Sequence, residues 1–188
     1  MDNKATFYDA IRTHLFGGHL SQSQVDGIEA ILKACAEIHD QRQVAYILAT
    51  IYHECDKKMQ PIEEYGKGAG HDYGKKLKRS RQPYETPDQI YYGRGYVQLT
   101  WYENYAYQSK LLGIDLLNHP ELALQPDIAA KILIHGMLHG DFTGHFLDQY
   151  FNKDEEDFVS ARKIINGLDM ANNIAGYALI FYRALTSN

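Results

Sequence analysis

Cysteine and tryptophan are scarce in this chain. Its 188 residues include two cysteines and one tryptophan. Two cysteines are too few for the disulfide framework of a small secreted protein, so a reducing compartment is the better expectation. Cys35 lies in an apolar helical pattern and is expected to be a buried thiol, whereas Cys55 directly follows Glu54.

Long apolar stretches are also missing. No run approaches the roughly 20 residues that a membrane-spanning helix requires. Residues 1–6 contain no apolar segment of the kind found in a secretory signal. We therefore expect no stable membrane insertion, and an extracellular target would require another factor to carry the protein to it.

A strong positive charge is absent as well. The formal net charge is -5, which disfavours nucleic acid as a partner. One local basic run, residues 75–81, is expected to be a solvated loop, with a supporting role against an anionic cell-wall polymer as the alternative. With 45% hydrophobic and 23% charged residues, the composition is that of an ordinary globular protein.

Apolar residues recur at helical spacing along most of the chain. Ser21, with Gln24 three residues later, matches a capping box, and Thr100 is placed to cap a later helix that Gly113 closes. The pattern predicts a mainly α-helical protein. The expected helices span about 7–16, 21–36, 42–56, 101–112, 126–140, 158–165 and 174–185.

Residues 60–95 interrupt this helical pattern. The segment is rich in glycine and contains three prolines. We expect a long irregular arm with at most a small hairpin, in which the turn at 93–95 leads into a polar and aromatic strand. Loops of this length in compact domains are usually functional or disordered. Candidate motifs lie at both ends of this one, which favours function.

Three carboxylates near the arm are candidates for chemistry. Glu54 ends an apolar helix, where partial burial disfavours its charged form and suits a general acid. Glu63 and Glu64 lie in the wetter arm and are expected to stay ionised, as a general base requires. The alternative is structural: two exposed loop carboxylates and a helix-end carboxylate in a salt bridge.

The order of the motifs changes this balance. Residues 45–54, 59–66, 92–101 and 161–167 together resemble the glycoside hydrolases of family 19, a chitinase-like and lysozyme-like family, and look most like its small phage endolysin branch. The resemblance covers about residues 15–186, and Tyr-Gly-Arg-Gly-aromatic-x-Gln-Leu-Thr is its most specific block. It implies a single lysozyme-like helical catalytic domain over residues 1–188, with the arm beside an active-site cleft.

The resemblance also implies an inverting mechanism. In such enzymes one carboxyl protonates the leaving oxygen and a second, roughly 6.5–9.5 Å away, activates water. By position Glu54 matches the acid, and Glu64 is the preferred base because it precedes Tyr-Gly. Glu63 is the rival base. Thr100 matches the hydroxyl residue that helps to hold the attacking water.

Further matched positions imply a sugar-binding surface, and no cofactor is expected. The polar and aromatic residues implied to contact or shape it are Gln98, Asn104, Asn166, Tyr92 and Arg94. A metal site is a separate hypothesis. His135 and His139 share a helix face, with Asp141 and His145 nearby. A surface histidine cluster is the favoured interpretation, so no metal is predicted.

The resulting hypothesis is a peptidoglycan hydrolase that cuts the β-1,4 bond between N-acetylmuramic acid and N-acetylglucosamine. The resemblance implies an endolysin that waits in the host bacterial cytoplasm, is admitted to the wall by a holin or by lysis, and acts on glycan strands as a monomer. One alternative is a chitinase acting on N-acetylglucosamine polymers. Another is a non-catalytic wall-binding protein, and an antibacterial effector with the same chemistry is a further setting.

Overall fold

The computed structural model describes residues 4–85 and 88–187. They form two compact units. Unit 1 contains the described residues up to Met59 and from Leu133 onward, and unit 2 is Gln60–Ile132. No helix among the described residues is both long and apolar enough to cross a membrane. That the two units act as one catalytic domain stays a prediction.

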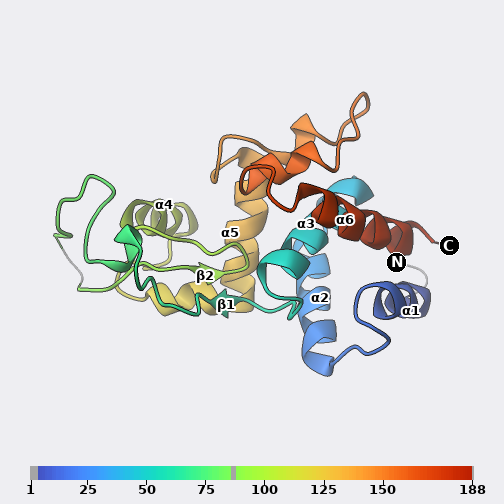
Figure 1. Cartoon of the computed structure of the whole chain (residues 1–188), viewed down its shortest axis with the longest axis horizontal. Helices are drawn as coiled ribbons and strands as arrows, with labels where there is room; N and C mark the ends of the chain where they lie inside the picture. Colours follow the sequence, from blue (N-terminus) through green and yellow to red (C-terminus); the bar gives the residue numbers. More distant parts are fainter. Residues whose placement is uncertain (1–3, 86–87, 188) are drawn as a thin grey trace. The chain divides into compact units, whose positions relative to one another are not determined.

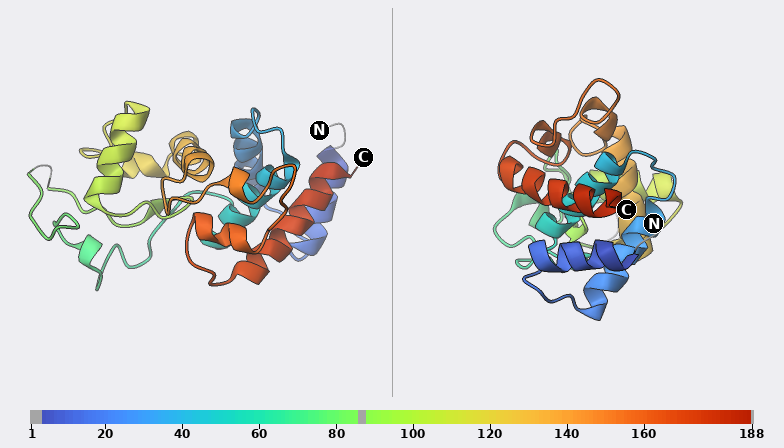
Figure 2. Two further views of the ribbon diagram at one scale, coloured as in Figure 1. Left: turned by 90° about the horizontal axis from the view of Figure 1, so that it is seen from above. Right: turned by 90° about the vertical axis from the view of Figure 1, so that its right-hand side faces the viewer.

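Unit 1 is built around one buried helix. Its elements are α1 (Lys4–His14), α2 (Gln22–Ala34), α3 (Gln41–Glu54), the end of α5 (Pro126–His139), α6 (Ala171–Thr186), and the 3-10 turns η3 (Leu147–Gln149) and η4 (Ser160–Ile164). Helix α3 is buried without interruption from Gln43 to Tyr52. Helix α6 packs along α3, and α1 packs on α6 (Figures 1 and 2). The core of this unit therefore surrounds the helix that carries Glu54.

The helix starts in unit 1 follow local capping chemistry. The Ser21 hydroxyl accepts a hydrogen bond from the backbone N–H of Gln24, and the Gln24 side chain accepts one from the backbone N–H of Ser21. This confirms the predicted capping box. The Asp40 carboxylate accepts a hydrogen bond from the backbone N–H of Arg42 and so caps α3, the helix that ends at Glu54.

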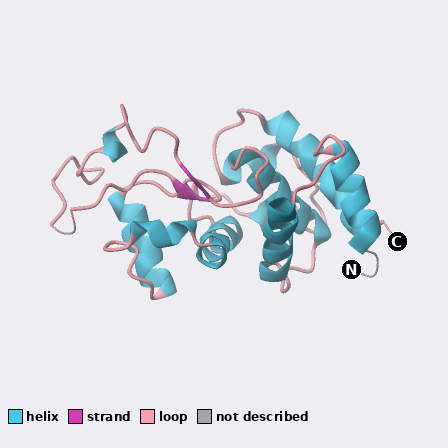
Figure 3. Ribbon diagram, turned by 90° about the horizontal axis from the view of Figure 1, so that it is seen from below, coloured by secondary structure: helices cyan, strands magenta, loops and turns pink. Residues whose placement is uncertain are grey.

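Unit 2 contains a small hairpin, helical segments and a long arm of loops. Strand β1 (Ile62–Glu63) pairs antiparallel with β2 (Arg94–Gly95), with Glu63 opposite Arg94. The other elements are η1 (Asp72–Gly74), α4 (Tyr102–Leu112), η2 (Pro120–Leu124) and the start of α5. Figure 3 shows the two strands in magenta and the loops in pink. The core of this unit includes Tyr91, Tyr105, Leu116 and Ile128.

The mainly helical class and the irregular arm with a small hairpin are confirmed, but three local predictions are wrong. The strand is Arg94–Gly95 rather than the residues after it, because Gln98 at φ +54° reverses the chain. Leu99 then donates its N–H back to the Arg94 carbonyl at 2.9 Å.

The second correction concerns Thr100, which does not cap α4. The cap residue is Trp101, at φ +73°, and its carbonyl accepts the first helical hydrogen bond from Tyr105 at 3.1 Å. The third concerns residues 158–165, where the helix shortens to the 3-10 turn η4. As predicted, Gly113 closes α4 in a left-handed conformation.

Candidate active site

Glu54 is the last residue of α3 and is held by a buried cation. Arg162 Nη1 lies 2.5 Å from Glu54 Oε1, and the two side chains are 5% and 19% exposed, respectively. Arg162 Nε also donates to the Asp169 carbonyl at 3.1 Å, which fixes the guanidinium. The salt bridge expected in the structural alternative is therefore present. It orients the carboxyl and places a positive charge directly against it.

Asn166 lies on the same turn of unit 1 as Arg162. Its backbone N–H donates to the Arg162 carbonyl at 3.1 Å, and its side-chain oxygen accepts a hydrogen bond from the N–H of Gly167 at 2.8 Å. The residue is exposed. Unit 1 thus brings together Glu54, Arg162 and Asn166 from two segments far apart in the sequence.

Glu64 directly follows strand β1 in unit 2 and is held by neutral donors. Tyr73 donates its hydroxyl to Oε1 at 3.0 Å, and the N–H of Gly93 donates to Oε2 at 3.0 Å. The Glu64 N–H in turn donates to the Gly93 carbonyl at 2.8 Å. Both carboxylate oxygens are therefore oriented by neutral groups, and no cation among the described residues forms an ion pair with Glu64. Each oxygen retains a lone pair that could accept a proton from water.

Glu63, the rival base, is held differently. Tyr92 donates its hydroxyl to Oε1 at 2.5 Å, and Lys67 Nζ lies 3.2 Å from Oε2. The Tyr92 hydrogen bond, followed by Lys67, keeps the pKa of Glu63 below its ordinary value. A lowered pKa makes a carboxylate a weaker proton acceptor, so these contacts favour a structural ion pair at Glu63.

Arg94 lies inside unit 2 and is only 6% exposed. Its guanidinium stacks 3.7 Å from the centre of the Tyr92 ring, and Nη1 donates to the Tyr105 hydroxyl at 3.0 Å. The Tyr105 hydroxyl donates to the Tyr92 carbonyl at 2.9 Å. Arg94 therefore shapes the site by fixing Tyr92 rather than by offering its charge to solvent.

Gln98 and Thr100 lie in the turn that follows β2. The Gln98 amide donates to the Ile62 carbonyl at 3.2 Å and to the Gly95 carbonyl at 3.4 Å, which ties the turn to the hairpin. A Cβ at Gly93 would come within 2.6 Å of Gln98 Oε1, so this close approach requires glycine. Thr100 is half-buried, next to Trp101, whose N–H donates to the Tyr91 carbonyl at 2.9 Å.

Asn104 lies in the first turn of α4. Its side-chain oxygen accepts a hydrogen bond from Arg79 Nη2 at 3.1 Å. Glu103, its neighbour, accepts one from the backbone N–H of Arg79 at 2.7 Å. Asn104 therefore anchors the arm to α4, in addition to any contact that it makes with a sugar.

Sequence reasoning missed two residues that hold the candidate carboxylates. Arg162 lies four residues before Asn166 in the motif at residues 161–167. Its position in that motif is the only feature of the sequence that could have indicated its role. Tyr73 had no such feature, because its contact with Glu64 depends on how the arm folds. That fold rests on Gly68 and Gly74, whose backbones approach so closely that a Cβ at either would overlap the other.

The histidine cluster of unit 1 is engaged in local contacts. His135 Nδ1 lies 2.8 Å from Asp141 Oδ2, and the His139 ring stacks on His135 with centroids 4.1 Å apart. His145 Nδ1 lies 2.9 Å from the Tyr150 hydroxyl. Within residues 4–85 and 88–187, no group of three or more His, Cys, Asp or Glu side chains is arranged to hold a metal ion.

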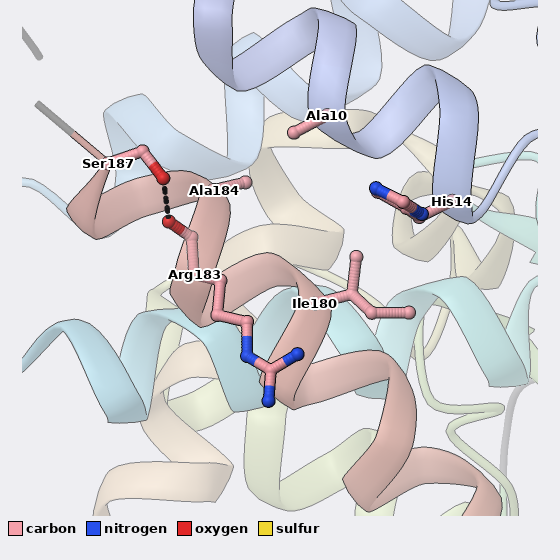
Figure 4. A pocket seen from close by; sticks show the side chains of 6 residues that line it. All are labelled: Ala10, His14, Ile180, Arg183, Ala184 and Ser187. Carbon is pink, nitrogen blue, oxygen red and sulfur yellow. Dashed lines mark hydrogen bonds between the residues drawn. The ribbon is translucent and has the colours of Figure 1, made fainter.

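A separate hollow of about 250 Å³ lies between α1 and α6 in unit 1 (Figure 4). Ala10 and His14 line it from α1, and Ile180 and Arg183 are among its residues on α6. Its lining combines three aliphatic side chains with His14, Arg183 and Ser187, and includes none of the candidate site residues. It offers no paired carboxylates and so no basis for glycoside chemistry.

Comparison with protein families identifies the class. A family model described as chitinase class I, of glycoside hydrolase family 19, matches residues 34–137, which is more than half of the chain. The chain therefore belongs to glycoside hydrolase family 19. The match contains Glu54, Glu63, Glu64 and the block at 92–101, but ends before Arg162.

Solved structures share the fold. Chitinase C from Streptomyces griseus HUT6037 aligns over 98% of this chain and 92% of its own, at 23% identity and a TM-score of 0.67. The class IV family 19 chitinase from Zea mays aligns over 100% and 96%, at 18% identity and a TM-score of 0.64. At these identities the likeness shows the fold alone, and it confirms the lysozyme-like helical architecture expected from the sequence.

Curated relatives match only short segments. Endochitinase 1 from Theobroma cacao is 48% identical over 46 residues, which is 24% of this chain and 14% of the relative. A protein named inactive chitinase-like protein 1, from Hevea brasiliensis, is 53% identical over 36 residues, or 19% of this chain and 12% of that one. Because both an endochitinase and an inactive protein carry such a segment, this likeness alone does not decide activity.

Proposed function

We propose that this protein is a glycoside hydrolase of the chitinase type, which cleaves β-1,4 bonds in polymers of N-acetylglucosamine by inversion. Membership of family 19 and the chitinase fold support this choice. These comparisons favour the chitinase alternative over the peptidoglycan hypothesis. No cofactor enters the proposed reaction.

The observation that carries the proposal is that the two carboxylates at the positions matching the family's acid and base, Glu54 and Glu64, are each held in a fixed orientation. Glu54 is paired with the buried Arg162, whereas neutral donors hold Glu64. We assign Glu54 as the acid that protonates the leaving oxygen, and Arg162 balances the charge left behind. Glu64 is assigned as the base that takes a proton from the attacking water, with Thr100 helping to hold that water.

The first test is Glu54→Gln, with soluble oligomers of N-acetylglucosamine as substrate. Removing a general acid should lower kcat by about 10²–10⁴-fold, while circular dichroism shows an unchanged fold. Glu37→Gln, at an exposed position in the same unit, is the matched control and should keep full activity. An inverting enzyme releases the α-anomer first, which proton NMR detects within minutes. Retained activity in Glu54→Gln would overturn the proposal.

Peptidoglycan hydrolysis is the second candidate. The cations of the arm at residues 75–81 favour it, because chitin is neutral whereas wall glycans carry carboxylates. This candidate includes the narrower expectations of an endolysin released from the bacterial cytoplasm and acting as a monomer on glycan strands. Release of N-acetylmuramic acid reducing ends from purified sacculi, detected by mass spectrometry, would favour it over chitin.

A further inference from the structure

The arm of unit 2 encloses a pocket that the proposed reaction does not use. We call it the arm pocket, and its volume is about 190 Å³. Ligand sites for drug-sized molecules usually run to roughly 300–1,000 Å³, so this one suits a single sugar ring or its substituent. The lining residues used below are Asp72, Lys75, Lys78, Arg79, Arg81 and Trp101.

Trp101 gives the arm pocket an aromatic wall. Its side chain is half-buried, and the Arg79 guanidinium lies 5.9 Å from the centre of its ring. Aromatic faces pack against the apolar face of a sugar ring, and a guanidinium beside the ring supplies hydrogen-bond donors. The wall is thus able to bind a sugar and to orient its polar groups.

The arm pocket is linked to the candidate base. Trp101 packs edge-to-face on Tyr73, with centroids 5.9 Å apart at 72°, and Tyr73 donates its hydroxyl to Glu64. The pocket and the carboxylate therefore share one aromatic network within unit 2. A glycan positioned at Glu64 would have its next groups close to the Trp101 wall.

Positive charge is concentrated at this pocket in a chain of net charge -5. Its acidic partners are weakly held: Asp72 pairs with Lys75 at 3.0 Å and with Arg81 at 3.5 Å, and Glu85 pairs with Lys78 at 3.5 Å. The side chains of Asp72 and Glu85 are 52% and 88% exposed. Exposed ion pairs contribute little stability, so a ligand carboxylate can replace these partners.

We propose that the arm pocket is a subsite for a carboxylate-bearing amino sugar, with Trp101 against the sugar ring and the cations on the carboxylate. This inference rests on the second candidate for the function, peptidoglycan hydrolysis, and deepens it by assigning residues that would distinguish an anionic glycan from neutral chitin. In wall glycans the carboxylate comes either from the peptide stem or, once the peptide is removed, from the free lactyl group. Both sources present the same chemistry to the pocket.

Binding tests the inference without relying on turnover. We would use Glu54→Gln as a non-cleaving background and measure co-sedimentation with intact sacculi and with peptide-stripped strands. Adding Lys75→Gln and Arg81→Gln should weaken binding at least tenfold. The control pair Lys110→Gln and Lys131→Gln makes the same charge change at exposed positions of α4 and α5, and should change binding less than twofold.

Two further readouts sharpen the result. Binding without the pocket substitutions should fall steeply when salt rises from about 0.05 to 0.5 M, since exposed charges are screened. The fluorescence of Trp101, the sole tryptophan, should respond more strongly to carboxylate-bearing strands than to neutral N-acetylglucosamine oligomers. Equal effects of the pocket and control substitutions, or an equal loss of neutral-oligomer binding, would overturn the inference.

Failure of the inference and failure of the proposed function are distinguishable. If the wild type hydrolyses neither glycan but binding depends on the pocket cations, the catalytic proposal fails and the arm-pocket inference stands. If hydrolysis depends on Glu54 while binding to anionic strands ignores Lys75 and Arg81, the inference alone is wrong.

Discussion

At the scale of single residues, the three candidate carboxylates are held in three different ways. Glu54 faces a buried guanidinium, Glu63 is shared between a tyrosine hydroxyl and a lysine, and neutral donors hold Glu64. A general base must be ionised yet still basic, and a carboxylate tied into an ion pair meets the second condition less well. The partners therefore separate Glu64 from Glu63, which the sequence alone left as rivals.

This contrast predicts different outcomes for two substitutions that remove the same charge. Glu64→Gln should lower kcat by about 10²–10⁴-fold, because no other group is assigned to activate the water. Glu63→Gln should lower it by less than about tenfold, through looser packing of Tyr92. Initial rates on N-acetylglucosamine oligomers measure both, and the reverse order would assign the base to Glu63.

The hydrogen bond from Tyr92 to Glu63 predicts a dependence of stability on pH. Because this contact keeps the pKa of Glu63 below its ordinary value, the carboxylate stabilises the fold at neutral pH. That stabilisation is lost as the pH falls below about 5, where the unfolded chain takes up the proton first. The side chain is 33% exposed, so solvent screening limits the effect to under about 1 kcal/mol.

Tyr92→Phe should raise the pKa of Glu63 toward its ordinary value and flatten this decline in stability. Carboxyl NMR titration and urea unfolding at pH 7 and pH 4 measure the two effects. High salt should weaken the Lys67 contribution but leave the Tyr92 contribution, which separates the two partners. An unchanged titration of Glu63 in Tyr92→Phe would show that the hydroxyl is not the main cause.

At the scale of elements, the arm depends on the close contact between Gly68 and Gly74. In Gly74→Ala the new Cβ would overlap the Gly68 backbone, so the arm must shift. Tyr73 is the adjacent residue and holds Glu64. A misplacement of about 1 Å at a catalytic group can cost about 10²-fold in rate. We therefore expect kcat to fall about 10–100-fold.

The control for this substitution lies in the same arm. Gly66 has open space around the position of a Cβ and no positive φ, so Gly66→Ala should keep kcat within twofold. Circular dichroism should show the helices intact in both variants. Similar kinetics for Gly74→Ala and Gly66→Ala would mean that the contact between Gly68 and Gly74 does not position the base.

The helices and strands also show which features of the fold can be predicted from the sequence. Helix periodicity, the Ser21 capping box and the Gly113 closure were readable because each depends on residues within one or two turns. The wrong predictions of the helix cap at Thr100 and of the strand have the same kind of cause. The strand ends where Gln98 has a positive φ, and the helix begins at Trp101, which also has a positive φ. Neither residue is glycine, so the sequence does not indicate these conformations. The roles of Arg162 and Tyr73 could not be predicted from the sequence, because their contacts with Glu54 and Glu64 are set by tertiary packing.

At the scale of the whole molecule, the two units carry separate natural probes. Both cysteines are in unit 1, where burial raises the pKa of each thiol to about 12, so folded protein should resist thiol reagents. Trp101, the sole tryptophan, is in unit 2. Thiol reactivity therefore reports unfolding of one unit, and tryptophan fluorescence reports unfolding of the other.

We expect the two probes to follow one transition in a urea titration, as a single catalytic domain requires. The physical reason is that α5 contributes residues to both units, and unit 2 is inserted in the chain between the two parts of unit 1. Melting either unit therefore removes hydrogen bonds from a helix that the other one uses. Coincident midpoints would support one cooperative domain. If the tryptophan fluorescence changes at a clearly lower urea concentration than the thiol reactivity, unit 2 unfolds by itself.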